Sequence, residues 1–167
     1  MYDRMLVPRD FLVPGSLDGP GYRLRMLSFD DAEKDFEAVM ASADQLRGLF
    51  GPENPWPEGV TLKEDMIDLA WHQREFTLRH SFAYTVMSSD EASCLGCTYI
   101  FPSNVPDYDA VVFYWVRSGV DHDARDKELG AQFRQWLASD WPFRAPAFPG
   151  RDIPWSEWLS LNRPGKG

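Results

Sequence analysis

Two apolar segments that lie close together in the chain, with a polar loop and a helical pattern behind them, constrain the fold most. Residues 94–101 (CLGCTYIF) and 110–117 (AVVFYWVR) have the length and the aromatic and β-branched content of strands. A turn rich in proline and aspartate separates them at 102–109. A polar loop follows, and apolar residues then recur at helical spacing over about 127–139. The segment therefore predicts strand, turn, strand, loop and helix.

The loop between the second strand and this helix is of a type that binds anions. A helix N-terminus offers free backbone N–H groups and the positive end of the helix dipole. The loop here reads DHDARD over residues 121–126. Carboxylates thus occupy positions where an anion would favour glycine and arginine. The sequence predicts the geometry of an anion site together with side chains that oppose an anion.

The N-terminal part of the chain predicts an arm, a strand and a helix. Residues 1–21 are rich in proline and glycine, so we expect an extended arm there. Tyr22–Met26 alternates apolar and basic side chains, which is typical of a strand with one buried face. Ser28 and Asp31 then form a helix N-cap pattern, and apolar residues repeat at helical spacing to about Ser42.

The middle of the chain predicts a loop, a long helix and a strand. Three prolines and two glycines exclude regular structure from residues 51–59. Thr61 and Glu64 form a capping box that opens a helix over about 62–79, and a strand follows at about 82–87. With a short strand and a helical turn in the tail, the order is β-α-α-β-β-β-α-β. This order indicates one α+β domain on a mainly antiparallel sheet flanked by helices.

Composition and charge exclude several classes of function. The 167 residues carry a formal net charge of −9, which opposes nucleic-acid binding because that binding relies on lysine and arginine. An acidic surface favours cationic amines as substrates, but it is more often a feature of solubility. No apolar run approaches the ~20 residues of a membrane helix, and residues 1–10 lack a signal-peptide core. We therefore expect a cytoplasmic protein without nucleic-acid or membrane partners.

The two cysteines, Cys94 and Cys97, have the spacing of a metal or redox motif. No second Cys pair or Cys/His pair stands at zinc-site spacing. Residues three apart on a regular strand also point to opposite faces, so the two thiols would not share a metal. We expect buried strand cysteines and no metal site.

In its order of elements and in several short motifs, the sequence resembles the GNAT superfamily of N-acetyltransferases. Residues 22–32 (YRLRMLSFDDA) are similar to the first strand and helix of that family. Residues 95–100 (LGCTYI) resemble its LG-x-x-x-I strand. Residues 114–117 (YWVR) resemble the strand that pairs with the pantetheine arm of acetyl-CoA. Apolar positions of the helix that follows are matched by Leu129, Phe133 and Trp136.

The resemblance implies a GNAT-like domain over residues 22–167, with a shortened C-terminal part, and acetyl-CoA as co-substrate. The cofactor would lie in a cleft between the strands of residues 94–101 and 110–117. The implied acceptor is a small amine or a protein N-terminus. The residues implied to hold the cofactor are Tyr114, Trp115, Val116, Arg117, Arg125 and Lys127.

The sequence departs from the family's pyrophosphate loop, whose pattern is Gln/Arg-x-x-Gly-x-Gly/Ala. The match puts Asp121 at the first position, Ala124 at the first glycine and Asp126 at the last position. A carboxylate at 126 would repel a pyrophosphate, and its side chain would obstruct close backbone approach. No tyrosine occurs after Tyr114 to protonate a departing thiolate. These departures keep open a second hypothesis, in which a non-catalytic GNAT-like domain binds another small ligand or a protein partner.

Asp109 and His122 are the candidate catalytic residues. Asp109 precedes the second strand, near where the resemblance places an acidic base, and it also fits as a turn residue. His122 lies in the acidic loop, where an imidazole suits a general base, although a lone loop histidine is more often solvated.

Several other residues have a binding or a packing interpretation. Trp56, in the proline-rich loop, would line an acceptor pocket or pack over the core. His72 and Glu75 are expected as surface and packing residues of the long helix. A lid or a homodimer surface would explain the tryptophans that cluster toward the C-terminus, which are Trp136, Trp141, Trp155 and Trp158.

Overall fold

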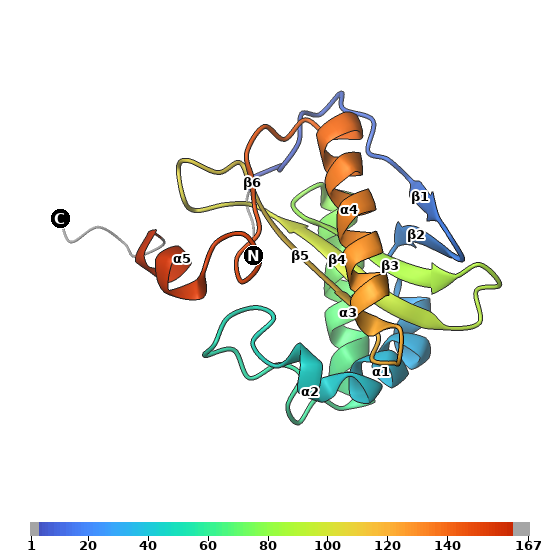
Figure 1. The fold of residues 1–167 in the computed structure, drawn as a ribbon. Coiled ribbons are helices and arrows are strands. Elements are labelled where there is room, and N and C mark those ends of the chain that lie inside the picture. The colour runs from blue at the N-terminus through green and yellow to red at the C-terminus, as the bar shows by residue number, and fades with distance from the viewer. Residues whose placement is uncertain (1–3, 162–167) are drawn as a thin grey trace.

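A six-stranded sheet runs through the molecule in the computed structural model, which describes residues 4–161 (Figure 1). The strands lie in sequence order: β1 (Ser16–Gly19), β2 (Tyr22–Met26), β3 (Phe82–Ser88), β4 (Cys94–Phe101), β5 (Ala110–Val116) and β6 (Pro146–Ala147). Neighbours from β1 to β5 are antiparallel, and β6 is parallel to β5. The prediction of an α+β fold on a mainly antiparallel sheet is confirmed.

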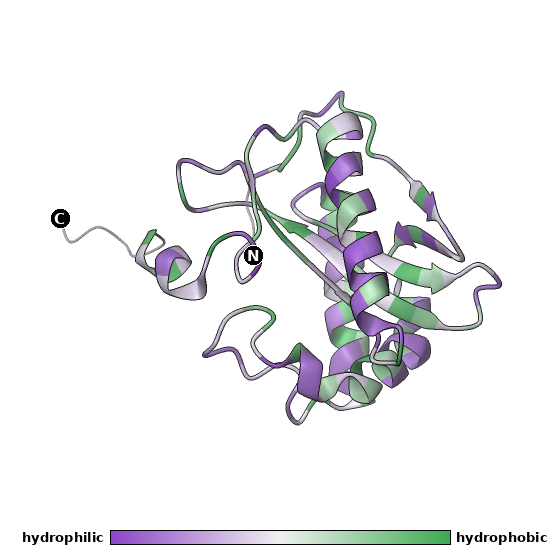
Figure 2. Cartoon of the chain, viewed as in Figure 1, coloured by the Kyte–Doolittle hydropathy of each residue, from purple (hydrophilic) through white to green (hydrophobic). Residues whose placement is uncertain are grey.

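Helices cover both faces of this sheet (Figure 1). They are η1 (Phe29–Asp31), α1 (Ala32–Ala41), α2 (Ala43–Leu46), α3 (Leu62–Leu78), α4 (His122–Asp140) and α5 (Trp155–Leu161). Helices α1 and α3 pack on one face, and α4 packs on the other. Strands β3 to β5 are hydrophobic or of intermediate hydropathy, whereas β1, β2 and the side of α4 turned away from the sheet carry hydrophilic residues (Figure 2). Among the described residues, every helix is too short or too polar to span a membrane.

The ends of the helices follow from local sequence. Ser28 and Asp31 form a capping box ahead of α1, and Thr61 and Glu64 form one ahead of α3. In the second box, the Thr61 N–H donates to the Glu64 carboxylate at 2.9 Å. Both predicted helix starts are therefore confirmed. Within the segment expected to be an extended arm, residues 16–19 form β1, which pairs with β2.

The start of α4 differs from the prediction. The helix begins at His122 rather than near 127, so most of the acidic segment 121–126 lies in its first turns instead of in a loop. The physical reason is that a carboxylate in the first turn of a helix is stabilised by the helix dipole, and Asp123 stands there. The loop after β5 is consequently short.

The two edges of β5 are paired to different extents. Along one edge, β4 pairs with it continuously from Gly96 to Phe101. Along the other edge, β6 pairs only with Ala110 and Val111. The expected cleft between residues 94–101 and 110–117 is therefore wrong, because hydrogen-bonded neighbouring strands leave no room for a ligand. The sheet opens instead between β5 and β6.

Candidate functional site

The open edge of β5 borders a pocket of about 220 Å³ beside the end of β6. Its strand wall is Val112–Tyr114, which has β4 on the other side. The other walls come from α2 and the turn behind it, the turn after β6 and the start of α5, through Gln45, Arg47, Gly48, Leu49, Pro149, Gly150, Arg151 and Trp155. Because β6 ends at Ala147, this edge of β5 offers backbone groups to an extended partner that carries amides. We call this space the β5–β6 slot.

The side chain of Arg151 reaches into the β5–β6 slot. Its Nη2 donates to the carbonyl oxygen of Tyr114 at 3.0 Å, and its guanidinium carbon lies 3.6 Å from the centroid of the Tyr114 ring. The same guanidinium pairs with both oxygens of Asp126, at 2.8 and 2.7 Å. A side chain of this chain therefore caps the strand edge and neutralises the carboxylate on α4.

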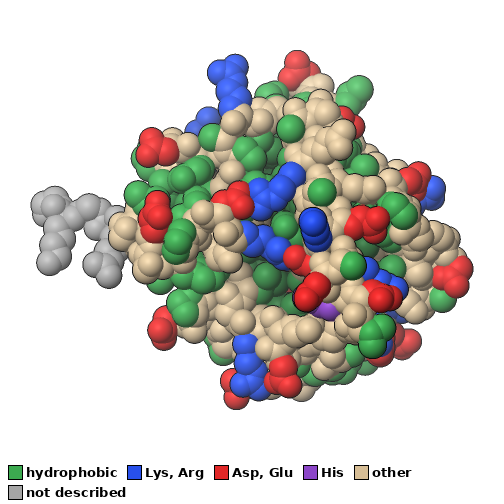
Figure 3. Space-filling view, viewed as in Figure 1, with side chains coloured by type: hydrophobic (Ala, Val, Ile, Leu, Met, Phe, Trp, Pro, Cys, Tyr) green, Lys and Arg blue, Asp and Glu red, His purple; other side chains and the backbone are tan. Residues whose placement is uncertain are grey.

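A second ion pair links α4 to the turn after β6, and here the cation is on α4 and the carboxylate is on the turn. Arg134 of α4 donates to both oxygens of Asp152, at 2.7 and 2.9 Å, and its guanidinium lies 3.8 Å from the centroid of the Phe148 ring. Basic and acidic side chains accordingly lie interleaved on the face of the molecule that carries α4 (Figure 3). Two bidentate pairs fix the turn after β6 against α4.

The N-terminus of α4 borders a smaller pocket of about 140 Å³. The pocket is lined by Arg117, Ser118, Gly119, Val120, Asp121, His122 and Arg125. Asp121 is the N-cap residue, but its side chain does not cap the helix, so the first turn keeps free N–H groups. The sequence predicts an anion site at this helix N-terminus, and Arg125 lies at the rim of the pocket as an exposed cation.

The cations proposed to hold a cofactor differ in how strongly they are engaged. Arg117 forms a bidentate ion pair with Glu37 of α1. Arg125 is 53% exposed and lies 3.8 Å from Asp121, which is a loose contact. Lys127 is exposed on α4. Of the three, Arg125 is the cation with a pocket beside it and a weak competing partner.

Tyr114, Trp115 and Val116 are all buried in β5, where their side chains alternate between the two faces. Tyr114 borders the β5–β6 slot, and its ring faces α4. The Trp115 ring lies in the opposite core, where its Nε1 donates to the Tyr99 hydroxyl at 3.2 Å. Val116 lies on the α4 face, away from the slot lining. Of the three, the structure brings only Tyr114 to the slot.

Asp109 and His122 lie at opposite ends of β5, and the structure does not bring them together. Both oxygens of Asp109 accept backbone N–H groups, from Arg144 at 2.6 Å and Ala145 at 3.1 Å. These bonds hold the segment that leads into β6. His122 is 26% exposed, and its Nδ1 lies 3.1 Å from a carboxylate oxygen of Asp123. The seven residues of β5 alone span about 20 Å, so the two side chains cannot act on one atom.

Trp56 lies in an aromatic cluster on the α1 and α3 side of the sheet. Its ring centroid is 5.2 Å from that of Phe50, which is in turn 5.1 Å from that of Phe113. Trp155 stacks on the other side of the cluster, 6.2 Å from Phe113. Trp56 is half-buried and packs against the core, one ring away from the residues that line the β5–β6 slot.

A group of buried ionisable residues on the same side was not predicted. Burial, and then the charge of Asp65, raises the pKa of Asp35 well above its ordinary value. Burial, together with the charge of Asp68, raises the pKa of Asp65 to about 7. The expectation of surface positions for His72 and Glu75 is wrong, since they are 7% and 0% exposed. Their signal in the sequence was the helical spacing of Asp65, His72 and Glu75 with apolar neighbours.

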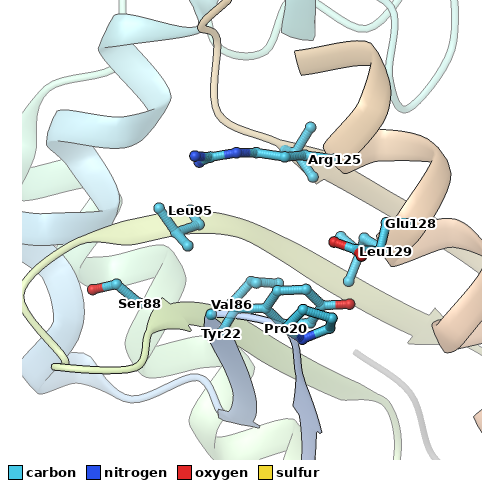
Figure 4. Close-up of a pocket in the computed structure, with 10 residues that line it drawn as sticks. Pro20, Tyr22, Val86, Ser88, Leu95, Arg125, Glu128 and Leu129 are labelled. Carbon is cyan, nitrogen blue, oxygen red and sulfur yellow. The ribbon is translucent and has the colours of Figure 1, made fainter. Parts of the chain in front are cut away.

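A third pocket, of about 280 Å³, lies between the sheet and the first turns of α4 (Figure 4). Its walls are mainly apolar and include Tyr22, Val86, Leu95 and Leu129. Arg125 extends across this pocket above Leu95, and Glu128 stands on its α4 side (Figure 4). The pocket is on the opposite face of β5 from the aromatic cluster.

Comparison with known proteins identifies relatives by structure alone. No known family model and no curated protein matches the sequence. The structure resembles ribosomal-protein-S5-alanine acetyltransferase from Vibrio fischeri, at 16% identity and a TM-score of 0.54, over 73% of this chain and 66% of that one. It also resembles RimL, a ribosomal L7/L12 alpha-N-protein acetyltransferase in complex with coenzyme A, at 13% identity and a TM-score of 0.54, over 73% and 67% of the two chains.

A third similar structure is the microcin C7 self immunity acetyltransferase MccE in complex with acetyl-CoA and AMP. It has 9% identity and a TM-score of 0.59, over 77% of this chain and 71% of that one. This chain thus spans about two thirds of the length of the structures it resembles. Likeness at these identities establishes the fold, and it confirms the GNAT-like fold predicted from the sequence.

Proposed function

We propose that this chain, which has the GNAT fold, is an acetyl-CoA-dependent N-acyltransferase that acts on a small amine or a protein N-terminus. The observation that carries the proposal is the edge of β5 that β6 leaves unpaired, beside the N-terminus of α4. The pantetheine arm of acetyl-CoA is an extended chain with amide groups, so it can pair with a strand edge. Its pyrophosphate would then reach the free N–H groups of the helix. Likeness to structures solved with coenzyme A and acetyl-CoA supports this assignment.

The chemistry requires an oriented thioester and an amine that attacks it. Nitrogen attacks the thioester carbonyl carbon, the carbon–sulfur bond breaks, and the thiolate leaves as the amine loses a proton. Backbone N–H groups along Val112–Tyr114 would stabilise the oxyanion that develops on the carbonyl oxygen. The β5 backbone would also hold the thioester in line for attack.

The acceptor would approach from the aromatic side of the slot. Phe113 and Trp155 stack there, and Trp56 lies one ring beyond. Aromatic faces attract an ammonium group, and the net charge of −9 favours a cationic substrate. One similar protein is named as a ribosomal L7/L12 alpha-N-protein acetyltransferase, which supports a protein N-terminus as one class of acceptor. The proposal includes a cytoplasmic location and a homodimer.

The proton acceptor is proposed to be Asp109 or His122, and their separation allows one experiment to decide. The pH profile of kcat/KM would lose its acidic limb in the variant that lacks the base. His122→Gln changes the N-terminus of α4, whereas Asp109→Asn changes the segment leading to β6. A profile that is unchanged in both variants would exclude the two residues as the base.

Isothermal titration with acetyl-CoA, at low and moderate salt, tests the proposal directly. We expect micromolar binding by the wild-type protein. Leu49→Trp should weaken binding at least tenfold, because the indole ring is larger than the leucine side chain and would fill the β5–β6 slot. Ile67→Trp is the matched control, since Ile67 is 62% exposed on α3. No heat at millimolar acetyl-CoA would contradict the proposal and favour a non-catalytic domain.

A further inference from the structure

The contacts of Arg151 distinguish it from the other cations near the slot. It is the residue that joins the edge of β5 to α4, through the Tyr114 carbonyl at 3.0 Å and the Asp126 carboxylate at 2.7 and 2.8 Å. Its side chain is 29% exposed and that of Asp126 is 24% exposed, so solvent reaches the pair. Because solvent reaches both side chains, another anion can compete with Asp126 for the guanidinium.

The bidentate pair of Arg151 with Asp126 has the geometry of an arginine–phosphate contact. A guanidinium presents the same fork of N–H donors to a carboxylate and to a phosphate. Asp126 stands in the second turn of α4, one turn behind the N-terminus of the helix. A carboxylate of the chain therefore occupies the position of an anionic ligand, with the arginine that would hold that ligand already beside it.

We propose that Arg151 is a phosphate-binding residue of this protein. Without a ligand it pairs with Asp126, and a pyrophosphate that binds replaces the Asp126 carboxylate. The inference rests on the proposed function, because acetyl-CoA is the pyrophosphate carrier that it assigns to the slot. Release of Asp126 also withdraws Arg151 from the Tyr114 carbonyl, which is then free for a pantetheine amide. One movement thus exposes the strand edge and supplies a cation to the phosphates.

Two substitutions separate the effect of the competing Asp126 carboxylate from that of the Arg151 cation. Asp126→Asn keeps the shape of the side chain and removes the charge that competes with phosphate, so it should strengthen acetyl-CoA binding five- to tenfold. Arg151→Gln should weaken acetyl-CoA at least tenfold and reduce the salt dependence of binding. Arg151→Gln should not weaken pantetheine, which has no pyrophosphate. Arg151→Lys keeps the charge without the fork and should fall between wild type and Arg151→Gln.

The other ion pair of the same turn supplies a matched control. Arg134→Gln breaks the pair with Asp152, which resembles the Arg151 pair in geometry but lies outside the lining of the slot. It should lower thermal stability by an amount similar to Arg151→Gln and leave acetyl-CoA affinity within twofold. Comparison of the two variants removes any effect that comes only from loosening the turn.

Failure of this inference can be distinguished from failure of the proposed function. Acetyl-CoA binding that is unchanged or tightened by Arg151→Gln would overturn the inference and leave the function standing. If acetyl-CoA binds to none of the variants, the function fails, and inorganic pyrophosphate becomes the probe. Pyrophosphate bound by Asp126→Asn but not by Asp126→Asn/Arg151→Gln would then still support the phosphate site. Equal binding, or none, by both of these variants would overturn it.

Discussion

The two edges of β5 are used in different ways. Toward β4 the edge is paired along its length, and the contact is so close that Gly96 leaves no room for a side chain. Toward β6 the edge is paired at Ala110 and Val111 only, and Arg151 covers the Tyr114 carbonyl further along it. The same strand is thus a structural element on one side and a binding surface on the other. A strand edge thus becomes available for binding where the neighbouring strand ends early and a side chain that can be displaced covers the gap.

The closed edge should be the less tolerant of the two. A Cβ at Gly96 would lie 2.1 Å from the Trp115 carbonyl oxygen, and the φ angle of Gly96 is +156°. The oxygen belongs to the backbone of β5, and β4 and β5 cannot move apart without breaking the sheet. We expect Gly96→Ala to cost about 3 kcal/mol or more in the free energy of unfolding, as measured by urea denaturation.

Gly15 provides the control for this change. A Cβ at Gly15 meets nothing within 4 Å, so Gly15→Ala should change the free energy of unfolding by less than about 1 kcal/mol. A Gly96→Ala protein as stable as Gly15→Ala would show that the β4–β5 contact can relax, and the contrast between the edges would then be lost.

The β6-facing edge of β5 should lose its paired neighbour when the Asp109 side chain is removed. Its carboxylate accepts the N–H groups of Arg144 and Ala145 and so holds the chain that enters β6. Asp109→Ala should lower the free energy of unfolding by about 2 kcal/mol, since two hydrogen bonds to a charged acceptor are lost. Hydrogen exchange should accelerate in residues 144–147 and remain slow in β4. Equal acceleration in β4 would mean that the two edges open as one unit.

Helix α3, which packs on one face of the sheet, should make the stability of the protein depend on pH. Asp65 of α3 is 3% exposed, and burial raises its pKa to about 7, above the usual value near 3.9. The folded state therefore holds this proton more tightly than the unfolded state. The contribution to stability is unaffected below about pH 4 and declines as pH rises from about 4 to 7, because the unfolded state ionises first. Asp35 acts with the same sign.

Removing this carboxylate should flatten the pH dependence. Asp65→Asn should raise the free energy of unfolding at pH 8 by about 1.5 kcal/mol and have no effect near pH 4. Thermal unfolding between pH 4 and 8 measures this difference. Asp44→Asn is the control, since the Asp44 side chain is 96% exposed. If Asp65→Asn shows the same pH slope as wild type, the buried carboxylate is not the source.

The sequence predicted most elements of the fold because their signals are local. The capping residues at Ser28 and Thr61 mark their helices, and the apolar runs at 94–101 and 110–117 mark the two central strands. The predicted start of α4, near residue 127, is wrong because the likeness of residues 121–126 to an anion-binding loop favours a loop there. Its carboxylates in fact suit the first turns of a helix.

The site was harder to predict because it depends on pairing between distant residues. Which edge of β5 stays open is decided by the length of β6, a strand of two residues with little signal of its own. Arg151 stands 25 positions from Asp126, and nothing in the sequence near either residue indicates their ion pair. Asp126, whose charge opposes a phosphate in the sequence pattern, is neutralised by Arg151 in the folded protein.

Trp56 gives the smallest expected effect, and it tests how far the open edge extends toward the acceptor. Its ring packs on Phe50 and is half-buried, so Trp56→Phe should reduce the free energy of unfolding by less than about 1 kcal/mol. If Trp56 only supports Phe50 and Phe113, the KM for an amine acceptor should change by less than threefold, and the affinity for acetyl-CoA should not change. Steady-state kinetics with wild-type and Trp56→Phe proteins measures both quantities. Phe29→Leu, at an exposed position on η1, controls for loss of aromatic area. A rise in KM of tenfold or more, at unchanged kcat and unchanged acetyl-CoA affinity, would place the acceptor directly on Trp56 and extend the binding surface beyond β5.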